Sequence, residues 1–185
     1  PSGMSKMWQS LWRSVLAATL LLAPMAARAA ADDVAVVIGN QRYAGTLPAA
    51  PMAERDAARV RDYLLQVAGV PSARLLQLHD VDRAEMARLF AVGGRVERLV
   101  KPGDSDIFGY YAGHGAPGED GGPALLGRGG GRYPLASLLA RLAELPARRV
   151  TVVLEAGFSG ISHAGPVATP ASPTPLPAAG TLPGH

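Results

Sequence analysis

The feature that most constrains the fold is a regular alternation of short apolar runs with longer amphipathic segments, which begins at Asp33. The first run, Val34–Gly39, is continuously apolar, as a strand buried on both faces is. The segment 52–68 instead spaces its apolar side chains at helical intervals, and Gly69 is suited to end that helix. A strand, a helix and another strand in succession are typical of a parallel sheet, because parallel neighbours need a crossover connection.

The same alternation continues along the chain and predicts further elements: strands over 74–78, Asp106–Ala112 and 149–154, helices over 82–100 and 134–145, and a short hairpin arm over 124–126. Asp82 and Glu85 have the spacing of a helix capping box. Gly93 and Gly94 predict a break within the same helix. We therefore expect one α/β domain over 31–165, with a mainly parallel sheet and helices on both faces.

The first 30 residues have the composition of a secretory signal peptide. Lys6 and Arg13 precede an apolar run over 15–23, and small residues suited to cleavage follow. The run is short and ends at Pro24, whereas a helix that spans a membrane needs about 20 apolar residues. We expect an exported protein, periplasmic or secreted, with no stable membrane span after removal of the signal peptide.

Export changes what the charge of the chain indicates. The chain has 18 basic and 15 acidic residues, but three of the basic residues lie in the first 30 and all the acidic ones lie beyond. The mature protein is then neutral, so the net charge of +3 does not indicate a nucleic-acid partner. Cysteine is absent, which excludes disulfides and cysteine-bound metals, and the four histidines lack metal-site spacing.

Polar and glycine-rich segments follow the predicted strands. Asn40 follows the first strand, His114 stands in YYAGHG after the strand Asp106–Ala112, and Gly157 stands in VVLEAGFSG after the last strand. Ligands of open parallel sheets bind at the carboxyl ends of the strands, so we expect these residues at one edge. We expect His114 on an exposed loop and assign Asn40 to satisfying backbone groups at the strand end. Neither GxGxxG nor GxxxxGK[ST] occurs, so nothing indicates a nucleotide site.

Four segments, VAVVIGNQRY, ERDAARVRDYL, IFGYYAGHG and VVLEAGFSG, occur in this order. Together, over residues 33–161, they resemble the p20 core of caspase-type cysteine peptidases, especially the metacaspase and bacterial caspase-like branch. The resemblance implies that His114 is the general base and that the backbone N–H groups of Gly115 and Gly157 form the oxyanion hole. Gly157 stands where the family has its nucleophilic cysteine, and glycine has no side chain that could attack a carbonyl.

The resemblance also assigns a pocket for an arginine or lysine side chain. Glu155 stands for the acid that precedes the cysteine, and Asp56 in ERDA matches an acid that lines this pocket in metacaspases. A pair of carboxylates suits a guanidinium group. The alternative for Asp56 is a solvated helix charge, and for His114 a polar loop position. We expect Glu155 to have a partner, because burial of an unpaired charge is costly. Calcium enters only because many metacaspases use it; the sequence indicates no metal site or other cofactor.

The sequence supports three functions. The first is a pseudo-protease that binds a peptide or protein with exposed arginine or lysine and does not cleave it. The second is a genuine cysteine endopeptidase that cleaves after arginine or lysine, with Gly157 or the short C-terminus as a sequence artefact. The third is an interaction fragment with no working pocket. The composition over 166–185 predicts a disordered tail in place of a full p10 portion, so we also expect an open sheet edge that a partner can cover.

Overall fold

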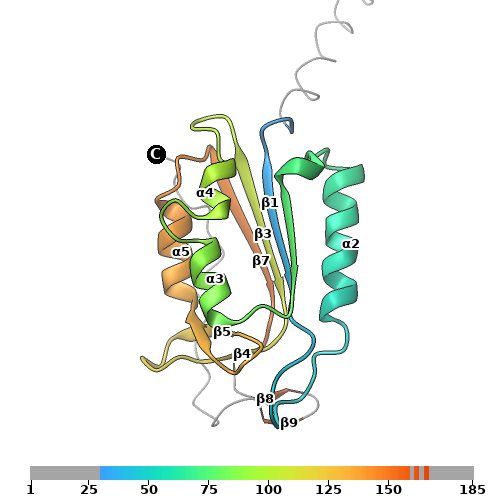
Figure 1. Cartoon of the computed structure of the whole chain (residues 1–185), viewed down its shortest axis with the longest axis vertical. Coiled ribbons are helices and arrows are strands. Elements are labelled where there is room, and N and C mark those ends of the chain that lie inside the picture. Colours follow the sequence, from blue (N-terminus) through green and yellow to red (C-terminus); the bar gives the residue numbers. More distant parts are fainter. Residues whose placement is uncertain (1–29, 159–160, 163–164, 167–185) are drawn as a thin grey trace, which may run out of the picture.

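The computed structural model describes residues 30–158, 161–162 and 165–166. The predicted signal peptide and the predicted tail lie outside the described residues, apart from residues 30 and 166. The described chain is built on a four-stranded sheet with the strand order β2-β1-β3-β7, in which every neighbouring pair is parallel. Its strands are β1 (Val34–Gly39), β2 (Leu75–His79), β3 (Asp106–Ala112) and β7 (Arg149–Glu155) (Figure 1). The predicted α/β fold with a mainly parallel sheet is confirmed.

Strand β1 lies in the interior of the sheet and is buried along its whole length. Val34, Val36 and Ile38 belong to the larger apolar core, while Ala35 and Val37 belong to a second core on the opposite face. Side chains of a strand alternate between its two faces, so a strand covered on both faces must be apolar at every position. This is why the run VAVVIG appears in the sequence without alternating polar residues.

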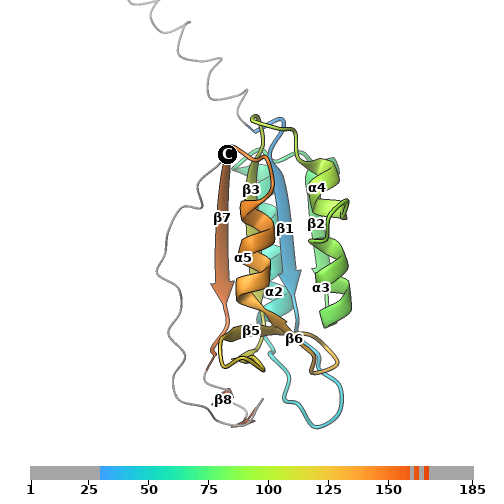
Figure 2. The ribbon, with the colours of Figure 1, turned by 90° about the vertical axis from the view of Figure 1, so that its left-hand side faces the viewer.

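Helices cover both faces of the sheet, as predicted (Figure 2). Ala57 and Leu64 of one helix pack in the smaller core, and Met86, Val96 and Leu138 of the other three pack in the larger core. The face with the smaller core is therefore covered by α2 (Ala53–Gln66). The face with the larger core is covered by α3 (Arg83–Leu89), α4 (Arg95–Leu99) and α5 (Leu135–Ala143). A short 3-10 turn, η1 (Ser72–Arg74), leads into β2.

The segment predicted as one helix over 82–100 forms two helices, α3 and α4. The prediction of a single helix was therefore wrong, and the predicted break at Gly93 and Gly94 is confirmed. Asp82 and Glu85 form the predicted capping box, in which each side chain accepts the backbone N–H of the other residue. Gly93 adopts a φ of 67°, a left-handed conformation that glycine tolerates without a steric penalty. The chain therefore turns between the two helices and restarts at Arg95.

A small antiparallel sheet extends from the carboxyl ends of the central strands (Figure 2). Its strands are β4 (Gly115–Pro117), β5 (Pro123–Leu126) and β6 (Arg132–Pro134), in that order. The sequence predicted only a short arm within β5. A further antiparallel pair joins β8 (Ile161–Ser162) to β9 (Gly165–Pro166). No helix among the described residues combines the length and apolar character needed to span a membrane.

Candidate functional site

The carboxyl ends of β1, β3 and β7 are joined by backbone hydrogen bonds that bring the predicted residues to one edge of the sheet. The Asn40 N–H donates to the Ala112 carbonyl at 2.9 Å, and the Gly113 N–H donates to the Glu155 carbonyl at 3.2 Å. The strand register places Ala112 opposite both Gly39 and Glu155. The segments that contain Asn40, His114 and Gly157 therefore leave the sheet at the same level.

Asn40 binds backbone groups, as the sequence predicted. Its side chain is fully buried, and its Nδ2 donates to the carbonyls of Val81 at 3.0 Å and Leu126 at 3.2 Å. Its Oδ1 accepts the Val81 N–H at 2.9 Å. Asn40 thus connects the end of β1 to the turn before α3 and to the antiparallel arm, and all of its side-chain polar groups have partners in the protein.

His114 is not on an exposed loop, because the segment after β1 folds over its ring. Only 9% of the residue is exposed, and its ring lies 4.7 Å from the ring of Tyr43 at an interplanar angle of 32°. The His114 Nε2 lies 2.9 Å from the Pro48 carbonyl oxygen. A carbonyl oxygen can only accept a hydrogen bond, so Nε2 carries a hydrogen, and Nδ1 is the ring nitrogen that would hold the lone pair of a neutral imidazole. This is the tautomer that a general base needs.

Two tyrosine hydroxyls hold the backbone on either side of His114. The His114 N–H donates to the Tyr43 hydroxyl at 2.8 Å, and the Tyr111 hydroxyl lies 2.8 Å from the His114 carbonyl and 2.9 Å from the Leu126 carbonyl. Burial raises the pKa of Tyr111 well above its usual value, so this hydroxyl remains protonated as a donor. A Cβ atom at Gly113 would lie 2.7 Å from the Tyr43 hydroxyl, so only glycine leaves room for this arrangement.

The two glycines that the resemblance singles out are in contact, but they differ in the space around them. A Cβ atom on Gly115 would lie 2.7 Å from the Gly157 carbonyl oxygen and 2.6 Å from the Phe158 ring. The segment after β7 therefore packs directly against the GHG turn. Gly157 is exposed, and a Cβ atom there would meet nothing within 4 Å. A side chain fits at position 157 without displacing its neighbours.

Asp56 and Glu155 lie near a third polar group, the hydroxyl of Tyr110. Asp56 is in the first turn of α2, Glu155 is the last residue of β7, and Tyr110 is 3% exposed on β3 between them. Burial raises the pKa of Tyr110 most, the interaction of its hydroxyl with the Glu155 carboxylate raises it further, and the charges of Glu155 and Asp56 add to this. The buried hydroxyl has no hydrogen bond of normal geometry, although Glu155 is close enough to influence it. The sequence did not single out Tyr110, although it stands in the YYAGHG motif.

The two carboxylates differ from each other in their partners. Asp56 Oδ1 lies 3.4 Å from Nη1 of Arg59 and 3.9 Å from Nε of Arg55, so arginines of its own helix accompany it. Glu155 was expected to have a partner, and the neighbouring group that it influences is the Tyr110 hydroxyl. Among the described residues Glu155 forms no ion pair, and it is exposed at the sheet edge, where water can solvate its charge. Its carboxylate is accessible to a ligand.

The residues described by the structure contain no group of three or more histidine, aspartate or glutamate side chains arranged to hold a metal ion. The sequence matches no model of a known protein family and no curated protein.

Proposed function

We propose that this chain is a caspase-like pseudo-protease domain, which binds a peptide or protein segment with an exposed arginine or lysine and does not cleave it. The observation that carries the proposal is the contact between the GHG turn and the exposed Gly157. His114 stands within the GHG turn with its Nε2 bonded to the Pro48 carbonyl, and the exposed Glu155 precedes Gly157 by two residues. The four sequence segments that resemble the p20 core supply these residues.

Recognition would rest on Asp56 and Glu155. A guanidinium group presents several N–H donors in one plane, and the Glu155 carboxylate can accept two of them side by side. Asp56 adds negative charge from the first turn of α2, and the buried Tyr110 hydroxyl lies close enough to both carboxylates to be affected by their charges. A basic side chain would therefore replace water at Glu155 and share Asp56 with Arg59.

The chain lacks the nucleophile that a cysteine peptidase needs for the first step of cleavage. The N–H groups of Gly115 and Gly157 would polarise a bound carbonyl, and His114 would accept a proton through Nδ1. At position 157 there is no thiol to deprotonate. Cleavage by this route needs a covalent bond to the carbonyl carbon, so the remaining groups bind a peptide without turning it over.

The substitution Gly157→Cys tests whether only the nucleophile is missing. The structure leaves room for the new side chain, so we expect the variant to fold as the original chain does. Fluorogenic peptides ending in arginine or lysine should be cleaved by Gly157→Cys and not by the unmodified chain. The matched control is Gly157→Cys combined with His114→Ala, which should lose cleavage and also lose rapid alkylation of the thiol near neutral pH. Cleavage by the unmodified chain that disappears on His114→Ala would overturn the proposal.

Ligand binding is tested separately from cleavage. Glu155→Gln and Asp56→Asn should each weaken binding of an arginine peptide about tenfold, because each removes a charge from the guanidinium site. Asp62→Asn removes a charge farther along α2, at a side chain that is 48% exposed against 27% for Asp56, and should leave the affinity unchanged. Isothermal titration calorimetry at one salt concentration measures all three. Unchanged affinity in both site variants would favour an interaction fragment with no working pocket.

A cysteine endopeptidase is the second candidate function. The single observation in its favour is the free space at Gly157, which a cysteine side chain would occupy without a clash. Resequencing the gene across the codon for residue 157 decides between the two. A cysteine codon there would favour the endopeptidase, and a glycine codon would favour the pseudo-protease.

A further inference from the structure

Strand β7 is an edge strand whose outer side has no partner among the residues that the structure describes. The Glu155 carbonyl accepts from the Gly113 N–H, so the polar groups of Glu155 point toward β3. The N–H and C=O groups of successive residues in a strand point to opposite sides. The outward groups are therefore those of Val150, Val152 and Leu154. They form a template on which another strand can pair.

The face of β7 on the α2 side is also open to solvent among the residues that the structure describes. Helix α2 packs mainly over β1, β2 and β3, and Figure 2 shows it behind β3 and β1, away from β7. Thr151 is exposed, and Val153 is 39% exposed, which makes it one of the few large apolar side chains on the described surface that reach this level. The edge thus combines unpaired backbone groups with an apolar side chain that a neighbouring strand would shield from water.

The sequence of β7, RVTVVLE, is complementary to itself about Val152. In an antiparallel pair of two copies centred on Val152, Arg149 of one copy lies opposite Glu155 of the other. In the same pair Val150 lies opposite Leu154, and Thr151 opposite Val153. Opposite charges directly across an antiparallel pair stabilise it. Arg149 and Glu155 are both exposed and are free of ion pairs with other described residues.

The backbone is compatible with the same register. Centring on Val152 places the outward residues Val150 and Leu154 opposite one another, so all the outward N–H and C=O groups meet as hydrogen-bonded pairs. Moving the centre to Thr151 or Val153 would place Arg149 opposite Val153 or Gly157 and lose the charge pairing. One register therefore satisfies both the backbone and the side chains.

We infer that β7 pairs antiparallel with β7 of a second copy of this chain, joining the two four-stranded sheets into one continuous sheet. The interface is isologous, because the same strand contributes to both sides of a twofold axis at Val152. The inference is argued from the edge of β7 alone and does not need the proposed function, although Arg149 of the second copy and a ligand guanidinium would compete for the Glu155 carboxylate. No ligand is required for the pairing.

Charge exchange tests the inference in the full chain. Sedimentation velocity over a range of concentrations should show a monomer and dimer in equilibrium. Arg149→Glu and Glu155→Arg should each raise the dissociation constant about tenfold, because each places two like-charged pairs across the twofold axis. Combining the two substitutions restores opposite charges and should return the constant to within about threefold of the original. A monomer at every concentration, or a double variant as weak as the single ones, would overturn the inference.

The absence of cysteine allows a direct test of the register. Chains with Thr151→Cys, mixed with chains with Val153→Cys, should form a disulfide-linked heterodimer under mild oxidation, because these positions face each other as a non-hydrogen-bonded pair. Each single variant alone should cross-link more slowly. Val67→Cys is a control on exposed α2-side surface away from β7, at the residue that caps the helix. If the mixture cross-links no faster than this control, pairing at β7 is contradicted. Any dimer seen in sedimentation would then form through another surface, or β7 would pair with another protein. Peptide binding is not measured in either test, so failure would leave the proposed function unaffected.

Discussion

Asp80, directly after β2, holds the turn that follows β1 through its side chain and itself has an unusual backbone conformation. Its φ is 49°, in the left-handed region that few residues other than glycine, asparagine and aspartate adopt. Its Oδ1 accepts the N–H groups of Gln41 at 2.9 Å and Arg42 at 2.8 Å, and its Oδ2 accepts Nε of Arg42 at 2.7 Å. Burial raises the pKa of Asp80, but these hydrogen bonds outweigh burial and leave the pKa below its usual value.

Asp80→Asn should therefore reduce stability in a way that depends on pH. A carboxyl group with a lowered pKa in the folded state stabilises the protein above its unfolded pKa of about 4, and this contribution is lost as the pH falls through the folded pKa. We expect a cost of about 1–2 kcal/mol at pH 7, which disappears toward pH 2. Urea unfolding across this pH range measures it, with Asp62→Asn as an exposed control. A cost that stays constant with pH would contradict the role of the charge.

At the scale of residues, the sequence located the strand-end positions and missed the groups that organise them. Asn40, His114 and Gly157 follow apolar strands, and the topology of a parallel sheet brings such positions together. The Pro48 carbonyl and the Tyr43 hydroxyl contact His114 only because the loop after β1 folds back. A backbone carbonyl has no signature in the sequence, and this loop has no periodic pattern that would predict its path.

At the scale of elements, strong periodicity gave accurate strands and helices, and weak periodicity did not. The bounds of β1 and β3 were predicted without error, because each is a largely apolar run followed by polar and glycine residues. Strands β4 and β6 were missed because three residues are too few to establish an alternation. The exposure of one face of β7 also escaped prediction, since it depends on how far α2 extends across the sheet.

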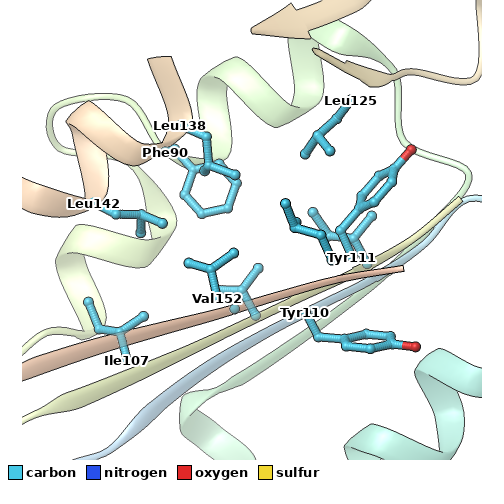
Figure 3. Close-up of a pocket in the computed structure, with 12 residues that line it drawn as sticks. Phe90, Ile107, Tyr110, Tyr111, Leu125, Leu138, Leu142 and Val152 are labelled. Carbon is cyan, nitrogen blue, oxygen red and sulfur yellow. The ribbon is translucent and has the colours of Figure 1, made fainter. Parts of the chain in front are cut away.

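Gly109 in β3 offers a test of packing within one element. It lines an apolar cavity of about 20 Å³ between the sheet and α5, together with Val152 and Leu142 (Figure 3). A Cβ atom at Gly109 would lie 3.7 Å from the nearest atom, a methyl group of Val152, which is an ordinary contact. Gly109→Ala should therefore stabilise the protein by about 0.5–1 kcal/mol, because it lowers the entropy of the unfolded chain and adds apolar contact.

Gly39 in β1 is the matched control for Gly109. A Cβ atom there would lie 2.9 Å from both the Ala53 carbonyl oxygen and the Ala57 Cβ, so Gly39→Ala should destabilise the protein. Thermal unfolding of the two variants should shift the midpoint in opposite directions. A lower midpoint for Gly109→Ala would show that the strand cannot accept even a methyl group at this position.

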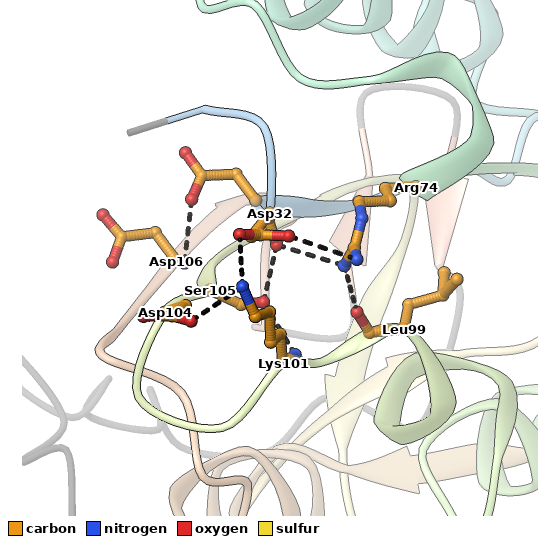
Figure 4. A network of polar contacts seen from close by, with 8 residues as sticks. Asp32, Arg74, Leu99, Lys101, Asp104, Ser105 and Asp106 are labelled. Carbon is orange, nitrogen blue, oxygen red and sulfur yellow. Dashed lines mark hydrogen bonds and ion pairs between the residues drawn. The ribbon is translucent and has the colours of Figure 1, made fainter. Parts of the chain in front are cut away.

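At the scale of the whole molecule, the candidate site and a stabilising polar network lie at opposite ends of the sheet. The carboxyl ends carry the candidate site, and the amino ends are held by a polar network around Asp32 (Figure 4). Arg74 donates to the carbonyls of Asp32 at 3.2 Å and Leu99 at 2.5 Å, and Lys101 Nζ lies 3.1 Å from Asp32 Oδ2. The Ser105 hydroxyl donates to the Asp32 carbonyl at 2.5 Å. The network thus joins the segments before β1, β2 and β3.

This separation predicts that stability and ligand binding can be changed independently. Arg74 is 27% exposed in its side chain and binds two backbone carbonyls, so Arg74→Ala should cost about 1–3 kcal/mol. Lys101 is 53% exposed, and Lys101→Ala should change the stability little, because water and salt screen its ion pairs.

Under conditions in which Arg74→Ala remains folded, its affinity for an arginine peptide should equal that of the original chain. Glu155→Gln, in contrast, should lose affinity for the peptide without losing stability. Denaturant unfolding and calorimetry on the same samples would measure both quantities. Reduced peptide affinity in folded Arg74→Ala would mean that the two ends of the sheet are coupled.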